Sequence, residues 1–241
     1  MKLWFLFEKK WPMSFISHHD TARLFERGFR RAELPLKFSK GYNPQPKLSF
    51  ASPLPVGVEG EREYGEFELN GEYSSNTLLN NLTSNINSKF PRGIKIKDIK
   101  EVNMDSVPKL MSMVEASLYG FDFSKLFSSE ELKKAVTYLQ ESNSLTFNRK
   151  SKKGKTKTID IKPMIYDLHI KNTLLEVLVQ TGSKGNVRPG ELIFKVLTGL
   201  YEDIDYQYIY RVRCTRKEVY CLKEDGMSKR LKLTPVWDFI N

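Results

Sequence analysis

The order in which the chain switches between the period of a strand and the period of a helix constrains its fold more than any other feature. Between residues 2 and 99 the apolar side chains follow the order strand, helix, strand, strand, helix, strand. The helix that opens at Ser17 is expected to end before Pro35. The other five expected elements are 2–9, 48–51, 63–69, 75–90 and 94–99. This order is that of the split β-α-β, or ferredoxin-like, fold.

The second half of the chain repeats this order without repeating the sequence. Turn-forming residues at 104–109, among them Asp105, Ser106 and Pro108, indicate a linker between the halves. The elements expected after it are strand 112–121, helix 129–142, strands 145–147 and 159–161, strand 174–180, helix 189–200 and strand 208–215. The sequence therefore predicts an α+β protein of two tandem ferredoxin-like domains, 1–103 and 110–241. The second domain is expected to carry a basic hairpin and a C-terminal extension.

An excess of positive charge points to a polyanionic partner. The 241 residues carry a formal net charge of +10, and 40% hydrophobic with 28% charged residues is the balance of a folded protein. Such a surplus attracts nucleic acid first and an acidic membrane second. The alternative is that the charge serves solubility alone, because net charge by itself does not select a partner.

Several classes of protein are excluded by what the sequence lacks. Cys214 and Cys221 are too few for a disulfide framework, which suits a reducing compartment. No apolar run is long enough for a membrane span or a signal peptide, so we expect a cytoplasmic protein without membrane contact. His18, His19 and His169 do not make a zinc site with these cysteines, and glycine motifs for nucleotides and cysteine motifs for iron–sulfur clusters are missing. We therefore expect no metal and no cofactor.

The first expected helix and the loop after it are rich in basic residues. Arg23, Arg27 and Arg30 recur at i, i+4 and i+7 and should line one face, with Arg31 at its edge. The loop adds the cations Lys37, Lys40 and Lys47 and the aromatic residues Phe38, Tyr42 and Phe50. Basic groups bind phosphates and interleaved aromatic rings stack on unpaired bases, so this segment is a candidate RNA-binding surface. The alternative is a solvated helix face beside core aromatic residues.

A second basic segment is the expected hairpin tip. Its cations are Arg149, Lys150, Lys152, Lys153, Lys155 and Lys157, with Lys162 shortly after them. The run 150–157 contains no acidic residue, which suits a finger that grips a phosphate backbone without reading its sequence. The alternative is an ordinary polar turn with Gly154 at its apex.

His18 is the candidate for chemistry. In the first turn of a helix the dipole favours a neutral imidazole, which could act as general base on a ribose hydroxyl. Tyr42, Lys40 or Lys47 could then steady the charge that develops on the phosphorus. We expect the alternative, a histidine that packs structurally in the capping turn. In either case His18 is expected at the mouth of a cleft lined by the loop 40–47.

Longer motifs give the chain a family resemblance. They are Phe-Ile-Ser-His-His-Asp at 15–20, Phe-Ser-Lys-Gly-Tyr-Asn-Pro-Gln-Pro-Lys-Leu-Ser-Phe at 38–50, Pro-Leu-Pro-Val-Gly-Val-Glu-Gly at 53–60 and Ile-Asp-Ile-Lys-Pro at 159–163. Over essentially its whole length the chain resembles the radical-SAM-linked protein family. This is a bacterial domain of unknown function, encoded beside or fused C-terminal to a radical-SAM protein. His19 departs from the pattern, since family members more often carry an apolar residue there.

The resemblance implies a radical-SAM partner and a link to RNA, because the family's genes often lie near those for ribosomal proteins and a ribosomal-RNA ribonuclease. At the level of fold, the chain also resembles the CRISPR repeat-processing endoribonucleases. Those enzymes pair two ferredoxin-like domains and cut RNA without metal.

Three functional hypotheses follow from the sequence. The first is an RNA-binding accessory protein without catalytic activity of its own, which presents ribosomal or transfer RNA to a radical-SAM partner for modification or processing. The second is a metal-independent endoribonuclease that uses His18. The third is a protein-interaction module of a radical-SAM enzyme that does not contact RNA. Only the first two predict RNA affinity that falls with salt, and only the second predicts cleavage in EDTA.

Overall fold

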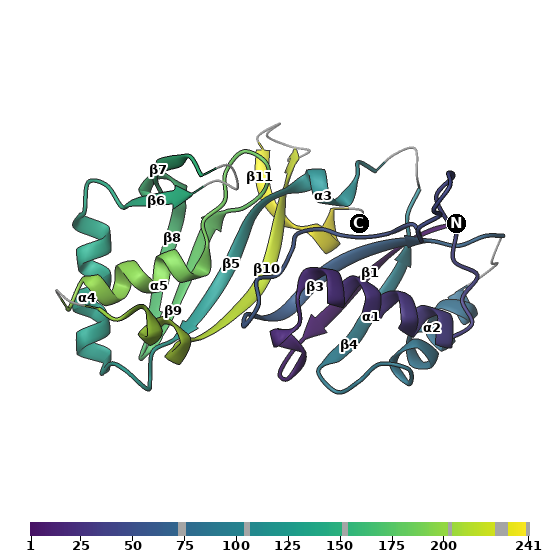
Figure 1. Cartoon of the computed structure of the whole chain (residues 1–241), viewed down its shortest axis with the longest axis horizontal. Coiled ribbons are helices and arrows are strands. Elements are labelled where there is room, and N and C mark those ends of the chain that lie inside the picture. The colour runs from purple at the N-terminus through teal and green to yellow at the C-terminus, as the bar shows by residue number, and fades with distance from the viewer. Residues whose placement is uncertain (72–75, 104–106, 151–153, 202–203, 225–230, 240–241) are drawn as a thin grey trace. The chain divides into compact units, whose positions relative to one another are not determined.

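The computed structural model describes residues 1–71, 76–103, 107–150, 154–201, 204–224 and 231–239. It is a mixed α+β structure with a large, mostly antiparallel sheet and, in the described residues, five α-helices (Figure 1). The chain divides into two compact units: unit 1 is 1–115 with 216–241, and unit 2 is 116–215. Each unit is described by itself below.

Unit 1 is built on an antiparallel sheet. Its strands are β1 (Lys2–Lys9), β2 (Leu48–Phe50), β3 (Glu59–Glu68), β4 (Ile94–Glu101), β10 (Arg213–Glu224) and β11 (Leu231–Pro235). β1 lies between β3 and β4, β3 also pairs with β2 and β10, and β11 pairs with β10. Strand β1 is therefore central, which fits its nearly unbroken apolar sequence.

Both faces of β1 are buried. The side chains of Leu3, Phe5 and Phe7 pack beneath two helices, α1 (His18–Arg31) and α2 (Asn76–Asn87). Trp4 and Leu6 point to the opposite face, because successive side chains alternate along a strand. There they pack with the short helix α3 (Leu110–Met113) and the 3₁₀ helix η4 (Val236–Asp238).

The packing of α1 depends on one glycine. A Cβ atom added at Gly28 would lie 2.2 Å from Cε1 of Phe90, too close for any side chain at this position. The helix can therefore approach the segment after α2 only because position 28 has no side chain. Phe90 in turn packs against the ring of Phe25, with centroids 4.9 Å apart.

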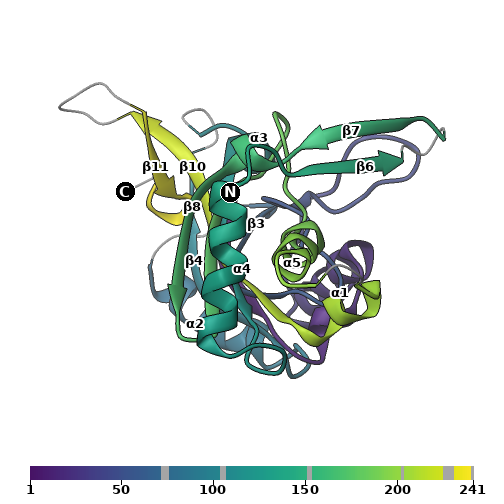
Figure 2. The ribbon, with the colours of Figure 1, turned by 90° about the vertical axis from the view of Figure 1, so that its left-hand side faces the viewer.

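The described residues of unit 2 form strands of the large sheet, a separate hairpin and two α-helices. The large-sheet strands are β5 (Val114–Asp122), β8 (Ile165–Lys171) and β9 (Leu174–Gln180), in the order β5-β9-β8. The hairpin consists of β6 (Thr146–Lys150) and β7 (Thr156–Asp160), and forms its own two-stranded sheet. The helices α4 (Ser129–Glu141) and α5 (Pro189–Thr198) lie side by side (Figure 2), and the 3₁₀ helix η3 (Tyr206–Arg211) follows them.

The order of elements expected for the first half is confirmed, and most of their ends lie within a few residues of the expected positions. The second half differs. Strand β8 was missed, and residues 208–211, expected as the start of a strand, belong to η3. The basic hairpin is present but lies outside the large sheet, so two tandem ferredoxin-like domains are not confirmed.

The predicted domain ranges, 1–103 and 110–241, stay a prediction. By compactness, residues 216–241 group with the N-terminal unit, because β10 pairs with β3 there. Residues 104–106 of the expected linker, which include Asp105 and Ser106, lie outside the described residues. In the described ranges, no helix has the length and apolar composition needed to cross a membrane.

Candidate functional site

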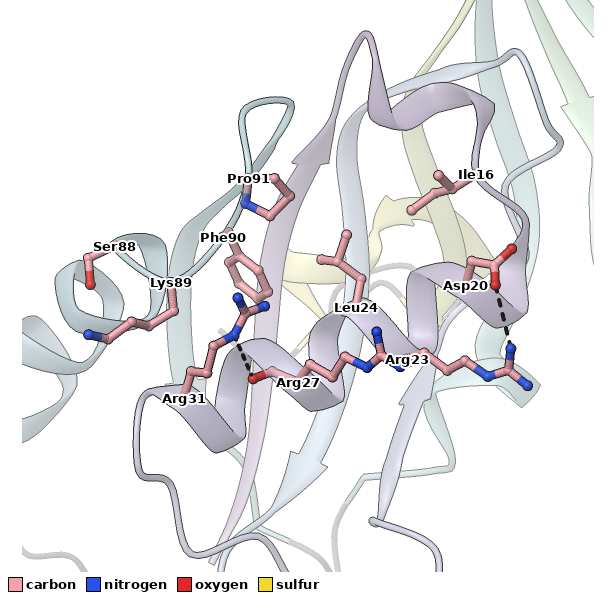
Figure 3. A pocket seen from close by; sticks show the side chains of 10 residues that line it. All are labelled: Ile16, Asp20, Arg23, Leu24, Arg27, Arg31, Ser88, Lys89, Phe90 and Pro91. Carbon is pink, nitrogen blue, oxygen red and sulfur yellow. Dashed lines mark hydrogen bonds and ion pairs between the residues drawn. The ribbon is translucent and has the colours of Figure 1, made fainter.

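A groove of about 630 Å³ runs along α1 in unit 1 (Figure 3). It lies between one side of the helix and the segment that follows α2. Its lining residues are Ile16, Asp20, Arg23, Leu24, Arg27, Arg31, Ser88, Lys89, Phe90 and Pro91. The groove therefore combines basic side chains with an apolar floor.

Three of the four arginines of α1 line the groove. Arg23, Arg27 and Arg31, spaced by four residues, line the groove, because each step of four turns the next side chain by about 40° around the helix. Arg30 does not line it. Its guanidinium lies 2.9 Å from the Glu26 carboxylate and over the ring of Phe38, 5.4 Å from the centroid. Arg23, Arg27 and Arg30 are all exposed, and RNA binding by this stripe stays a prediction.

Positive charge in the groove is mostly uncompensated. Asp20 is the one acidic side chain among the described residues that line it, and it lies 3.7 Å from the guanidinium of Arg23. The hydroxyl of Ser17 donates to the Asp20 carboxylate at 2.6 Å and lowers its pKa, so Asp20 is ionised at neutral pH. Arg27, Arg31 and Lys89 have no carboxylate partner in the described part of the chain. These three cations are therefore available to an external anion.

The floor of the groove is formed by Leu24, Phe90 and Pro91 (Figure 3). Phe90 is half-buried, so part of its ring faces the groove. Cations at the rim over an apolar floor suit a ligand that has anionic groups joined by apolar surface. A nucleic-acid strand, with phosphates joined by sugars and bases, has this composition.

The loop 38–47 is closed on itself. Phe38 and Pro46 form an isolated bridge, and the amide of Gln45 donates to the Ser39 hydroxyl at 2.9 Å. Tyr42 is fully exposed, and its neighbour Gly41 has φ +133°, a conformation that favours glycine. The loop thus presents a tyrosine to solvent.

Lys40 and Lys47, the two lysines of this loop that were proposed as site residues, differ in their ion pairing. Lys47 donates to both carboxylate oxygens of Glu68, at 3.1 and 3.0 Å, and Lys37 approaches the same carboxylate at 3.1 Å. Burial acts to raise the pKa of Glu68, but Lys47 and Lys37 outweigh this effect and hold that pKa below its usual value. Lys40, in contrast, is exposed. Lys47 therefore stabilises the base of the loop.

His18 is the first residue of α1. The hydroxyl of Ser17, the residue before it, caps the helix by accepting from the amide of Asp20 at 3.1 Å. The imidazole packs edge-on against Phe50, with ring centroids 5.7 Å apart. Burial, together with the positive charges of His19 and Lys9, lowers its pKa, so His18 is neutral at pH 7.

The groove along α1 is lined neither by His18 nor by any residue of 40–47. His18 therefore does not stand at the mouth of this groove, and the expected cleft between it and that loop stays a prediction. Its ring contacts Phe50, and the packing role expected from the sequence stays a prediction.

A buried ionic cluster near His18 was missed by the sequence analysis. Arg216 donates to both carboxylate oxygens of Glu63, at 2.8 and 2.5 Å, and to the carbonyl of Ser52 at 2.9 Å. The ammonium of Lys9 donates to the carbonyl of Ile16 at 2.9 Å. Burial is the largest influence on Lys9 and, despite the nearby carboxylate of Glu63, lowers its pKa to about 8. The cluster ties β1, β3 and β10 to the loops beside α1.

Little in the sequence could have revealed this cluster. Lys9 precedes a second lysine at a strand end, which is typical of an exposed position. In the structure Lys9, Glu63 and Arg216 are each at most 3% exposed. Glu63 and Arg216 also have charged neighbours in their strands, so no local signal marks either residue for burial.

The basic hairpin contains both paired and exposed cations. Arg149 donates to the two carboxylate oxygens of Glu191, at 2.7 and 2.5 Å, and to the carbonyl of Asn186 at 2.8 Å. Lys162 donates to the carbonyls of Leu139 and Gln140 at the end of α4. Arg149 and Lys162 are therefore structural contacts rather than parts of a free basic tip.

The remaining cations of the hairpin have no such role in the described residues. The side chains of Lys150, Lys155 and Lys157 are exposed. Lys152 and Lys153, which were expected to grip phosphates, lie outside the described residues. Phosphate binding by the hairpin stays a prediction.

Among the described residues, no group of three or more His, Cys, Asp and Glu side chains is placed to hold a metal ion. Cys214 and Cys221 are both buried and unlinked. Burial raises the pKa of the Cys221 thiol to about 11, which disfavours the reactive thiolate at neutral pH.

Comparison with known proteins gives a family and little more. No curated protein matches the chain. One solved structure, described as an unknown protein from Galdieria sulphuraria, is 10% identical over 89% of this chain and 96% of that chain. Its TM-score of 0.23 is too low to support a shared fold. The sequence model of one family matches residues 2–189, which is more than half of the chain. The chain therefore belongs to the family described as "Uncharacterized protein conserved in bacteria (DUF2344)".

Proposed function

We propose that this protein binds RNA through the groove along α1 and acts as an accessory protein rather than as a catalyst. One observation carries the proposal: Arg27, Arg31 and Lys89 have no carboxylate partner in the described part of the chain, and they surround an apolar floor. An exposed cation without a carboxylate partner can bind a phosphate without first losing an ion pair. Arginine is well suited to this, because its planar guanidinium can donate two parallel hydrogen bonds to phosphate oxygens.

The partner in this proposal is a radical-SAM protein in the cytoplasm, and the RNA is ribosomal or transfer RNA. The support for the partner is the resemblance of the runs 15–20, 38–50 and 53–60 to the radical-SAM-linked family. The support for RNA is the groove together with the net charge of +10. A fold of two tandem ferredoxin-like domains, expected from the repeated order of elements in the sequence, remains part of the proposal.

The endoribonuclease alternative gains no support from the groove. Its proposed base, His18, is neutral but packs against Phe50 and does not line the basic surface. Lys47, proposed to steady the developing charge, is paired with Glu68. We therefore keep the accessory role as the conclusion.

The test compares two variants that each lose two positive charges. Arg27→Gln with Lys89→Gln changes the groove, whereas Lys133→Gln with Lys134→Gln removes two exposed lysines of α4. Binding to a fluorescein-labelled RNA duplex with one bulged uridine is measured by anisotropy at several salt concentrations. Each lost phosphate contact should reduce the slope of log affinity against log salt by about 1, so the groove variant should lose about 2.

The lysine variant should retain most of the wild-type slope, since its cations lie outside the groove. Equal losses in the two variants would show that binding follows net charge and would remove the groove from the proposal. If the wild-type protein does not bind the duplex at low salt, the RNA-binding function itself is wrong.

A further inference from the structure

A second pocket, of about 350 Å³, lies wholly within unit 2. It is formed by the turn between β5 and α4, the end of α5 and the 3₁₀ helix η3. Its lining residues are Lys125, Leu126, Phe127, Leu197, Tyr201, Ile204, Tyr208 and Arg211. Its size is near the lower end of the range for small-molecule sites, which suits one ring system rather than a helix or duplex.

The interior of this pocket is apolar and aromatic. Leu197 and Phe127 are buried and form its base. Tyr201 and Tyr208 are 48% and 43% exposed, so each ring leaves much of its surface free. The ring of Tyr201 lies 6.1 Å from that of Phe127, a contact that supports Tyr201 from one side. Half-exposed rings on an apolar base form a platform on which a planar ligand can stack.

The rim of the pocket is cationic. The guanidinium of Arg211 lies over the ring of Tyr208, 4.8 Å from its centroid, and Lys125 is exposed. None of the described side chains that line the pocket is acidic. Glu202 and Asp203 lie between Tyr201 and Ile204 in the sequence but outside the described residues. The pocket therefore combines aromatic faces for a planar group with two cations for an attached anion.

We infer that this pocket binds one unpaired nucleotide of an RNA, with the base stacked on Tyr201 or Tyr208 and its phosphate held by Arg211 and Lys125. The inference rests on the proposed RNA-binding function and names the structural feature of the RNA that is recognised. A base inside a duplex has both faces covered by its neighbours. Only a bulged, looped or terminal nucleotide can place its face against a tyrosine.

Stacking on the tyrosines also predicts how the affinity for RNA depends on salt. A base–aromatic contact adds affinity that is insensitive to salt, whereas phosphate contacts in the groove produce salt dependence. The groove and the pocket should therefore be separable by variants that change one property and not the other.

The test uses two RNA duplexes, one fully paired and one with a single bulged uridine. The wild-type protein should bind the bulged duplex about tenfold more tightly, which corresponds to about 1.4 kcal/mol of stacking. Tyr201→Leu with Tyr208→Leu should abolish this preference while leaving the affinity for the paired duplex, and the salt slope of that affinity, unchanged. Tyr201→Phe with Tyr208→Phe, which keeps both rings, should retain the preference.

Tyr210→Leu is the matched control. Tyr210 is 83% exposed, belongs to the same 3₁₀ helix and does not line the pocket. It should retain the preference for the bulge. The groove variant Arg27→Gln with Lys89→Gln should weaken binding to both duplexes and keep their ratio. Thermal unfolding of each variant identifies any that lose affinity through loss of structure.

Two results would overturn the inference: equal wild-type affinity for both duplexes, or a preference that survives in the double leucine variant. If neither duplex binds, the proposed function fails, and the pocket is tested with uridine monophosphate by NMR. Chemical-shift changes at pocket residues that disappear in the double leucine variant would show a nucleotide site in a protein that does not bind RNA. No shifts would reject the pocket as well.

Discussion

Unit 1 contains two sets of cations, those of the groove along α1 and those of the buried ionic cluster, and they differ in exposure and in pairing. Arg27 and Arg31 are exposed and have no carboxylate partner in the described part of the chain. Arg216 is 1% exposed and holds both oxygens of the Glu63 carboxylate. A charge removed from water must be paired, whereas a solvated charge can remain free. Burial thus decides which cations support the fold and which can bind a ligand.

The largest expected effect is on the buried cluster. Arg216→Met should lower the free energy of unfolding by about 3–5 kcal/mol, because it leaves the Glu63 carboxylate buried and unpaired. Arg27→Met, which removes an exposed cation, should change it by less than about 0.5 kcal/mol. Urea titration followed by circular dichroism measures both values.

The double variant Glu63→Leu with Arg216→Met sharpens this comparison. With both partners of the ion pair replaced by apolar side chains, it should be more stable than Arg216→Met alone. A double variant as unstable as the single one would mean that lost packing, and not the unpaired charge, explains the effect.

The next effect concerns the pH dependence of stability through Lys9. Its pKa is about 8 in the folded protein and near 10.5 in an unfolded chain, so the folded state releases this proton first. Stability should therefore rise as the pH increases from 8 to 10.5. The gain is on the order of 2 kcal/mol. Lys9→Met should lack it, whereas Lys95→Met, at an exposed position on β4, should behave as the wild type.

The smallest expected effect concerns His18. His18→Ala should lower stability by about 1 kcal/mol through lost packing on Phe50, with RNA affinity unchanged. Because its pKa is lower in the folded state, the wild type should also lose stability as the pH falls below about 6.5, and the variant should lose less. RNA cleavage that persists in EDTA and vanishes in His18→Ala would instead establish a catalytic histidine.

Local structure was predicted well where a short segment carries its own signals. Helix α1 starts after Ser17 and α4 after Ser128, each capped by a hydroxyl that accepts from a backbone amide. Prediction failed at β8, because its side chains are mostly exposed or half-buried and its alternation is weak. It also failed at 208–211, where an aromatic-rich run typical of a strand forms η3 instead.

The candidate site was only partly predictable. Arg23, Arg27 and Arg31 were all named from the sequence, but Lys89, Phe90 and the apolar floor were not. The reason is that the second wall of the groove comes from the end of α2, and no local pattern places that segment beside α1. The pocket of unit 2 was missed for the same reason, since Lys125 and Arg211 are far apart in the sequence.

The sequence by itself determined the surplus of positive charge, most of the helices and strands, and the arginines of α1, because composition, caps and periodicity act over a few residues. Only the tertiary structure decided which charges distant in the sequence are paired. Glu63 and Arg216 are 153 positions apart, and Arg149 and Glu191 are 42 apart. Such pairs form when packing excludes water from both partners at once, and no neighbour in the sequence carries that information.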